Sequence, residues 1–308
     1  MFAVVPPQSL IRTNGVGFRC FVATRYMPAL LLAVAFSCIS AVDATADLAA
    51  DEPRPIRLMF LQQGPDGHPR ASHEYVTGVK LLARSLRDVP RLQVTVVDAD
   101  DPWIDGPERL TQADGVVLYL AEGAKWTQAE PRRKEAFARF AARGGAIVAL
   151  HWAIGTKSAE PIAGFQQLLG GCHGGPDRKY QVLETTVGPA RPDHPITAGI
   201  PEFKIRDEFY YRLKFVESPK APQPVLTALI DGERHAVAWS WERGDGGRSF
   251  GFSGAHFHEN WRRDEYRRLV SQAILWTLRI EPPRAGFPAT LEDQEFELPP
   301  APTKNVAK

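Results

Sequence analysis

The chain has 308 residues, of which 44% are hydrophobic and 24% are charged, and its formal net charge at pH 7 is +1. This composition is typical of a soluble globular protein with one large domain or two small ones. Because the chain has no long basic stripe or acidic tail, its charge pattern argues against nucleic acid and an anionic membrane surface as partners.

The N-terminal segment over residues 1–46 has the pattern of a signal peptide with a long n-region. Arginines precede an apolar stretch over residues 27–42, and Ala44-Thr45-Ala46 follows as a cleavage site. The apolar stretch is shorter than the ~20 residues that a membrane-spanning helix needs. We therefore expect an exported protein, periplasmic or extracellular, whose mature chain has no membrane span.

Alternatives remain open for this segment. It can be an uncleaved N-terminal anchor, translation can start at Met1 or Met27, and Cys38 stands in a poor lipidation motif. After a linker over residues 47–55, the mature chain has one cysteine, Cys172, so no intramolecular disulfide is expected.

The first hundred residues of the mature chain alternate between apolar strands and amphipathic helices. Strands are expected over residues 56–61, 92–97, 116–120 and 146–150. One helix is capped by Ser72 and continues to Leu86, and a second begins in a capping box that Thr127 opens and ends at Gly144. This alternation predicts a parallel sheet with helices on both faces.

The second half is richer in strands and ends in one helix. Strands are expected over residues 180–187, 204–215, 224–230, 235–241 and 249–253, with a hairpin turn at Asp245-Gly246. The last helix is expected over residues 264–278. Residues 281–308 contain six prolines and predict a loosely packed tail.

The loop His256-Phe257-His258-Glu259-Asn260-Trp261 stands between the last strand and the last helix, where open α/β sheets place ligand-binding groups. In extended chain, residues two apart point to the same face, so His256 and His258 can aim two imidazoles at one point. Neutral imidazoles bind metals such as zinc. Alternatively, one of the two is a general base that Glu259 orients, or one of them only packs.

His151 directly follows the strand over residues 146–150, at a position where some α/β enzymes carry a nucleophile. Histidine cannot serve there as the usual acyl acceptor, so hydrolysis by that route is disfavoured. We expect His151, His256 and His258 to act as catalytic groups and to bind a divalent metal such as zinc. The alternative for His151 is a histidine that is hydrogen-bonded in the core.

Two adjacent acids, Asp207 and Glu208, stand among aromatic residues and need partners if they are buried. They can be metal ligands, an acid/base pair or acceptors for sugar hydroxyls. The alternative is a salt bridge to Arg206 or Arg212. We expect Glu208 to be catalytic and Asp207 to bind substrate.

His73-Glu74 opens the first helix at the ligand-binding edge of the sheet, although Glu74 also suits the helix dipole by itself. Cys172-His173 stands in a glycine-rich, flexible loop, where His173 is expected to contact the pocket. Cys172 is a small buried residue or, in a third hypothesis, the nucleophile of a thiol hydrolase. The histidines expected in turns or at a strand start, and not at the site, are His68, His194 and His235.

Together these motifs resemble the trehalose-utilisation (ThuA-like) family over about residues 56–280. The matching pieces, in order, are His73-Glu74-Tyr75, residues 144–151, residues 194–199, residues 206–210, residues 237–239 and residues 254–261. The resemblance implies a class I glutamine amidotransferase-like α/β fold, a flavodoxin-like three-layer sandwich with a mainly parallel sheet and extra antiparallel strands in the second half. Because His151 stands where that fold class has its catalytic cysteine, glutaminase activity is not expected.

The family is associated with disaccharide or keto-sugar metabolism, so the resemblance implies a small-molecule sugar as partner. The expected substrate-binding residues are His73, Glu74, Trp152, His173, Asp207, Tyr210, Glu259, Asn260 and Trp261. Of these, Trp152, Tyr210 and Trp261 would stack on a sugar face. One hypothesis is therefore an exported, metal-assisted, sugar-active enzyme, and the other is a non-catalytic carbohydrate-binding or scaffold module.

Overall fold

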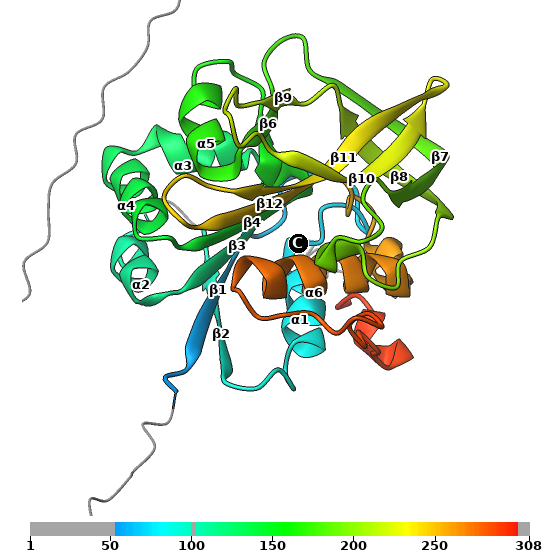
Figure 1. Cartoon of the computed structure of the whole chain (residues 1–308), viewed down its shortest axis with the longest axis horizontal. Coiled ribbons are helices and arrows are strands. Elements are labelled where there is room, and N and C mark those ends of the chain that lie inside the picture. Colours follow the sequence, from blue (N-terminus) through cyan, green and yellow to red (C-terminus); the bar gives the residue numbers. More distant parts are fainter. Residues whose placement is uncertain (1–52, 100–102, 301–308) are drawn as a thin grey trace, which may run out of the picture. The chain divides into compact units, whose positions relative to one another are not determined.

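A nine-stranded sheet with a parallel half and an antiparallel half organises the computed structural model, which describes residues 53–99 and 103–300 (Figure 1). The parallel half contains, in spatial order, β2 (Leu92–Asp98), β1 (Ile56–Gln62), β3 (Gly115–Tyr119), β4 (Ala146–Leu150) and β12 (Arg248–Phe252). The antiparallel half continues with β11 (Glu233–Glu242), β10 (Gln223–Ile230), β7 (Lys179–Pro189) and β8 (Phe203–Tyr211). The predicted α/β fold with added antiparallel strands in the second half is confirmed.

Side chains of the parallel strands alternate between two hydrophobic cores. In β1, Leu58 and Phe60 belong to one core, and Met59 and Leu61 belong to the other. Successive residues of a strand point to opposite faces, so a strand that is covered on both sides needs apolar residues at every position. The unbroken apolar runs in the sequence have this cause.

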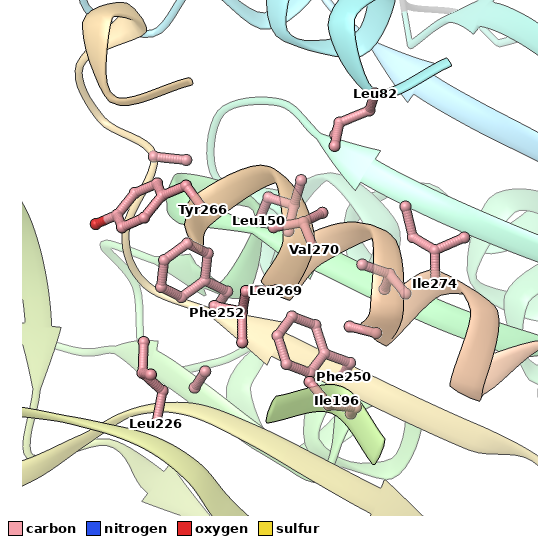
Figure 2. Close-up of a cluster of buried hydrophobic side chains, with 14 of the residues drawn as sticks. Leu82, Leu150, Ile196, Leu226, Phe250, Phe252, Tyr266, Leu269, Val270 and Ile274 are labelled. Carbon is pink, nitrogen blue, oxygen red and sulfur yellow. The ribbon is translucent and has the colours of Figure 1, made fainter. Parts of the chain in front are cut away.

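Helices contribute to both cores. The core that contains Phe60 includes residues of α1 (Tyr75–Ser85) and α6 (Asp264–Thr277). The other core includes residues of α2 (Gly106–Gln112), α3 (Gly123–Ala129), α4 (Pro131–Ala142) and α5 (Ile162–Leu169). Figure 2 shows Leu269 and Val270 of α6 beside Phe250 and Phe252 of β12, all of them buried.

Short elements complete the described part of the chain. A small sheet contains β5 (Gly155–Thr156), β6 (Gly171–Gly174) and β9 (Lys214–Phe215). Single 3₁₀ turns are η1 (His151–Ile154), η2 (Pro195–Thr197), η3 (His258–Arg262) and η4 (Asp293–Phe296). Of these, η1 and η3 follow β4 and β12 at the carboxyl edge of the parallel strands, where open α/β sheets place ligand-binding groups.

The predicted cap of the first helix is wrong. Ser72 forms a β-bridge with Phe257, and its hydroxyl donates to the carbonyl of Pro69, while α1 begins at Tyr75. Ser72 therefore ties the segment before α1 to the loop after β12, which is a tertiary contact that local sequence does not encode.

The predicted start of the second helix is also wrong. Thr127 lies inside α3, and the cap of α4 is Glu130, whose carboxylate accepts hydrogen bonds from the backbone N–H groups of Arg132 and Arg133. Pro131 then occupies the first helical position, where its missing N–H costs nothing. The prediction of a stop at Gly144 is confirmed, since α4 ends at Ala142 and Gly144 has a φ of 82°.

Three further predictions need correction. The strand expected over residues 204–215 breaks at Arg212, whose φ is 52°, and so becomes β8 and β9. The expected flexible loop around Cys172 is the buried strand β6. The tail is not loosely packed up to Pro300, because Phe296 is 5% exposed and its carbonyl accepts a hydrogen bond from His258. The helices α2, α3 and α5 were not expected.

The predicted signal peptide, anchor and linker up to residue 52 lie outside the described residues. Within the described part of the chain, no helix is long and apolar enough to cross a membrane.

Candidate functional site

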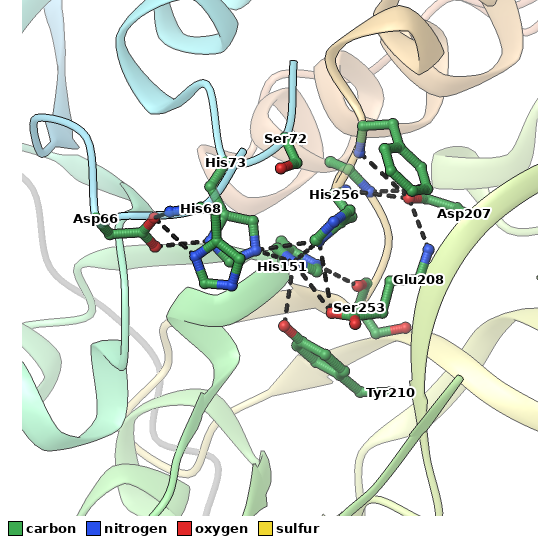
Figure 3. A network of polar contacts seen from close by, with 12 residues as sticks. Asp66, His68, Ser72, His73, His151, Asp207, Glu208, Tyr210, Ser253 and His256 are labelled. Carbon is green, nitrogen blue, oxygen red and sulfur yellow. Dashed lines mark hydrogen bonds and ion pairs between the residues drawn. The ribbon is translucent and has the colours of Figure 1, made fainter. Parts of the chain in front are cut away.

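Three histidines from distant parts of the chain meet at the carboxyl edge of the parallel strands (Figure 3). His73 lies between β1 and α1, His151 follows β4, and His256 follows β12. The Nε2 atom of His151 is 2.9 Å from Nε2 of His73 and 3.1 Å from Nδ1 of His256, and those two atoms are 3.0 Å apart. The three ring nitrogens therefore form a small triangle.

The tautomers of two of these histidines follow from their outer hydrogen bonds. Nδ1 of His151 lies 2.9 Å from the carbonyl oxygen of Ser253, and Nδ1 of His73 lies 2.6 Å from a carboxylate oxygen of Asp66. Both outer partners can only accept, so both Nδ1 atoms carry the proton and both Nε2 atoms present a lone pair. Two lone pairs thus face each other at 2.9 Å, which only a shared proton donor or a cation can stabilise.

A carboxylate and a phenol complete the cluster. The carboxylate of Glu208 lies 3.7 Å from Nε2 of His151 and 3.5 Å from Nδ1 of His256. The hydroxyl of Tyr210 lies 3.1 Å from Nε2 of His151. One ligand atom from each of His73, His151, Glu208 and His256 can be chosen so that all lie within 4.8 Å of one another, a grouping that could hold a metal ion.

Asp207 explains how Glu208 reaches this cluster from the far end of the sheet. Its carboxylate accepts hydrogen bonds from the backbone N–H groups of Ala255 and His256, at 2.8 and 3.1 Å. The antiparallel half of the sheet therefore bends back, so that β8 lies against the loop after β12. Because adjacent residues of a strand point to opposite sides, Asp207 anchors this loop while Glu208 faces the histidines.

The backbone is strained where it presents the histidines. His73 has a φ of 54° and His151 a φ of 51°, and Ala255, directly before His256, has a φ of 76°. Residues other than glycine rarely adopt positive φ angles, and several such residues close together often mark a functional site.

Burial keeps the histidine cluster neutral. His73, His151 and His256 are at most 8% exposed. Burial lowers the pKa of all three imidazoles, to about 4 for His256. A neutral imidazole is the form that binds metal. Burial also raises the pKa of the Glu208 carboxyl.

Asp66 supports the cluster from behind. Its carboxylate accepts hydrogen bonds from His73 at 2.6 Å and from the hydroxyl of Tyr75 at 2.7 Å. Although burial acts to raise the pKa of Asp66, the hydrogen bonds from His73, Tyr75 and His68 outweigh it and lower the pKa. A carboxylate behind a histidine is a common way to orient a metal-binding imidazole.

A cavity of about 150 Å³ opens beside the cluster. Its lining residues are His68, His73, Trp152, Lys157, His173, Arg178, Tyr180, Glu208 and Tyr210. The rings of His173 and Tyr210 are stacked, with centroids 4.1 Å apart. The cavity thus combines aromatic faces with charged groups next to the histidines.

The structure brings together most of the residues that the sequence analysis selected. His73, His151, Glu208 and His256 form the cluster, and Trp152, His173 and Tyr210 line the adjacent cavity. His73, expected to bind substrate, stands among the candidate metal ligands instead.

His258 does not belong to this cluster. Its Nε2 lies 2.8 Å from the carbonyl oxygen of Phe296. His256 and His258 do not point to one place because His258 begins the 3₁₀ turn η3, so the chain is no longer extended there. Among the predicted metal ligands, His151 and His256 thus lie in a grouping that could hold a metal ion, and His73, not His258, is the third histidine there.

Other predicted substrate-binding residues have structural partners instead. Trp261 is fully buried in the core of α1 and α6, and the side-chain amide of Asn260 donates to the carbonyl of Arg206. Asp207 anchors the loop. Glu259 is exposed and lies outside the lining, and Glu74 lines a different cavity, which also contains Asp66 and His68.

Five residues that contact the histidine cluster or line the cavity were not expected there. His68, expected only in a turn, lies against His73 with ring centroids 3.6 Å apart, and the carboxylate of Asp66 is hydrogen-bonded to both histidines. Both lie in the loop after β1, whose position at the carboxyl end of a parallel strand was the available signal. Lys157, Arg178 and Tyr180 also line the cavity, and no local pattern marks them.

Cys172 is not placed to act as a nucleophile. It is fully buried, and burial raises the pKa of its thiol to about 12, so the thiol stays protonated. The hypothesis of a Cys172 hydrolase is therefore not supported by this geometry.

Comparison with solved structures shows a shared fold. A ThuA-like protein from Bacteroides uniformis has a TM-score of 0.56 at 15% identity, covering 73% of this chain and 92% of its own. A ThuA-like protein from Parabacteroides merdae has a TM-score of 0.54 at 16% identity, covering 73% of this chain and 90% of its own. The glutaminase domain of Trypanosoma brucei CTPS, with bound acivicin, has a TM-score of only 0.39.

No curated protein matches the sequence. A family model described as "ThuA: Trehalose utilisation" matches residues 66–277, which include every residue of the histidine cluster. The chain therefore belongs to the ThuA family.

Proposed function

We propose that this protein binds a divalent metal such as zinc through His73, His151, His256 and Glu208, and that it acts on a sugar at this centre. The observation that supports the proposal is the triangle of ring nitrogens with edges of 2.9 to 3.1 Å. Among the three imidazoles only His256 can supply a proton, and the hydroxyl of Tyr210 reaches Nε2 of His151 alone, so two lone pairs still face each other. Three imidazoles and one carboxylate are a donor set that suits zinc.

In this proposal, the metal ligands and the residues that line the cavity have separate roles. A bound cation would polarise a hydroxyl or carbonyl oxygen of the sugar. The hydroxyl of Tyr210, 3.1 Å from Nε2 of His151, is placed to donate a hydrogen bond to an oxygen held there. Trp152 and Tyr210 offer aromatic faces on which a sugar ring can pack.

Zinc titration of the purified protein tests the metal site. Isothermal titration calorimetry is expected to give one zinc ion per chain, and both His151→Ala and His73→Ala are expected to lose it. The matched control is His194→Ala, since His194 is part-buried but lies outside the cluster. Equal zinc binding by all four proteins would rule out this centre.

A non-catalytic carbohydrate-binding module remains the second candidate function. The aromatic lining, with Trp152, His173, Tyr180 and Tyr210, is sufficient for binding a sugar without any reaction. Turnover separates the two functions: the zinc-loaded protein, incubated with disaccharides and keto-sugars, is expected to form products that chromatography detects. Sugar binding without turnover in any of these mixtures would favour the module.

We also propose that the fold is a flavodoxin-like three-layer sandwich and that the protein is exported. The spatial order β2-β1-β3-β4-β12 supports a flavodoxin-like three-layer sandwich of the amidotransferase type, because flavodoxin-like sheets have the order 2-1-3-4-5. We propose no glutaminase activity, since His151 occupies the nucleophile position. Export rests on residues 1–46, and N-terminal sequencing of protein secreted by a bacterial host tests it.

A further inference from the structure

Two cations, Lys157 and Arg178, line the cavity beside the histidine cluster. The metal proposal uses neither of them. The only negative side chain in the same lining is Glu208, and that carboxylate is assigned to the metal. If Glu208 ligates the metal, the cavity keeps an uncompensated positive charge.

Arg178 has no carboxylate partner in the described part of the chain. Its guanidinium makes one hydrogen bond, from Nη1 to the carbonyl of Gly175 at 3.2 Å. Neighbouring Lys214 differs, because its ammonium pairs with Asp177 at 2.6 Å. The half-buried guanidinium thus keeps donors for a planar anion, which arginine binds through two parallel hydrogen bonds.

Lys157 is the weaker of the two cations. Its ammonium lies 3.9 Å from the carboxylate of Glu122, and its side chain is 67% exposed. An exposed pair at this distance contributes little, so the lysine is free to add charge at the cavity.

His173 gives an independent sign that a polar ligand belongs here. It lines the cavity and is 2% exposed, yet its buried Nε2 has no hydrogen-bond partner among the described residues. A buried polar atom without a partner in a native structure calls for an explanation, and a ligand is one.

We infer that the substrate is an anionic sugar, whose carboxylate or phosphate pairs with Arg178 while a hydroxyl or carbonyl oxygen faces the histidine cluster. This inference rests on the proposed function and narrows it. Lys157 adds charge, and His173 is placed to bond a hydroxyl. A cavity of about 150 Å³ is smaller than usual sites for drug-sized ligands, so it suits one sugar ring.

Binding of three probes to the full chain tests this inference: D-glucose, D-glucuronate and D-glucose 6-phosphate, measured by calorimetry on zinc-loaded protein. At least one acid is expected to bind ~10-fold or more tightly than glucose, and Arg178→Met is expected to remove that preference. A preference for glucuronate identifies a carboxylate, and a preference for the phosphate identifies a phosphoryl group.

The matched control is Arg109→Met, which removes an equally charged, exposed residue of α2 outside the cavity lining. It is expected to leave all three affinities unchanged. Melting curves of Arg178→Met establish that it is folded, and Arg178→Lys is expected to keep part of the preference.

Equal binding of glucose and both acids would overturn the inference, and so would failure of both acids to bind. Repeating the titration after chelation separates it from the metal proposal. If zinc never binds but a preference for acids that depends on Arg178 persists, then the metal proposal fails and the anionic substrate stands.

Discussion

The histidine cluster adjoins a second polar cluster, formed by Asp207 with Ala255, His256 and Tyr266, and the two differ in how completely their hydrogen bonds are satisfied. Asp207 is fully buried, and its carboxylate accepts hydrogen bonds from Ala255, His256 and Tyr266. In the histidine cluster, Nε2 of His73 and Nε2 of His151 present lone pairs to each other.

The difference separates a structural group from a site for a ligand. A buried carboxylate with a full set of donors holds its loop in place, although burial raises its pKa to about 6. In the histidine cluster, two acceptor nitrogens face each other at 2.9 Å, an arrangement that needs a shared proton donor or a cation between them. Adjacent acids on one strand, Asp207 and Glu208, thus have different roles.

The largest effect is expected on removal of the structural group. Asp207→Ala leaves the N–H groups of Ala255 and His256 buried without an acceptor, and should lower the free energy of unfolding by ~3–5 kcal/mol, measured by urea denaturation. Glu259→Ala, an exposed acid nearby, should change it by under ~0.5 kcal/mol. A similar small change for Asp207→Ala would erase the distinction between the two clusters.

The second effect concerns the cluster itself. His256→Ala should weaken zinc binding ~100-fold, or ~2.7 kcal/mol, while changing the stability of the metal-free protein by under ~1 kcal/mol. His258→Ala, two residues away, should leave zinc affinity unchanged, because His258 bonds to Phe296 instead. Equal loss in both variants would return His258 to the metal set.

A smaller effect on zinc affinity is expected for Asp66, which is hydrogen-bonded to His73. Asp66→Asn preserves shape but removes the charge that holds the proton on Nδ1 of His73, so zinc affinity should fall ~10-fold. Calorimetry measures the affinity, and Asp177→Asn, on an exposed carboxylate, is the control. An unchanged affinity for Asp66→Asn would reduce Asp66 to a packing role.

The smallest effect is a shift of pH dependence. The pKa of His256 is lowered to about 4, so its neutral, metal-binding form persists as the pH falls from 7 and is lost only near that value. An exposed histidine is half protonated at pH ~6.5, whereas zinc should be released from this cluster only at a clearly lower pH. Dialysis at stepped pH with zinc analysis measures this. Release centred on pH ~6.5 would mean that burial does not protect the cluster.

The fold was largely predictable because its signals are local. Unbroken apolar runs marked β1, β3 and β4 as strands covered on both faces, and the turn at Asp245-Gly246 connects β11 to β12 as expected. Two of the wrong predictions involve residues with tertiary partners. Ser72 pairs with Phe257, and Phe296, within the proline-rich tail, is 5% exposed.

The site was predictable in part for the same reason. His151 and His256 follow strands directly, so their place at the carboxyl edge follows from chain order. His258 could not be placed, because the spacing of two residues has this meaning only in extended chain, and a 3₁₀ turn begins there. Asp66, His68 and Arg178 carried no pattern of their own.

The sequence by itself determined the order of the main strands, the family resemblance and the place of His151 and His256, because apolar periodicity and position after a strand are properties of neighbouring residues. Only the tertiary structure decided which histidines share a centre and which acid faces them. The choice of acid depends on how β8 lies against the loop after β12, through hydrogen bonds from Ala255 and His256 to Asp207 that span 48 and 49 residues.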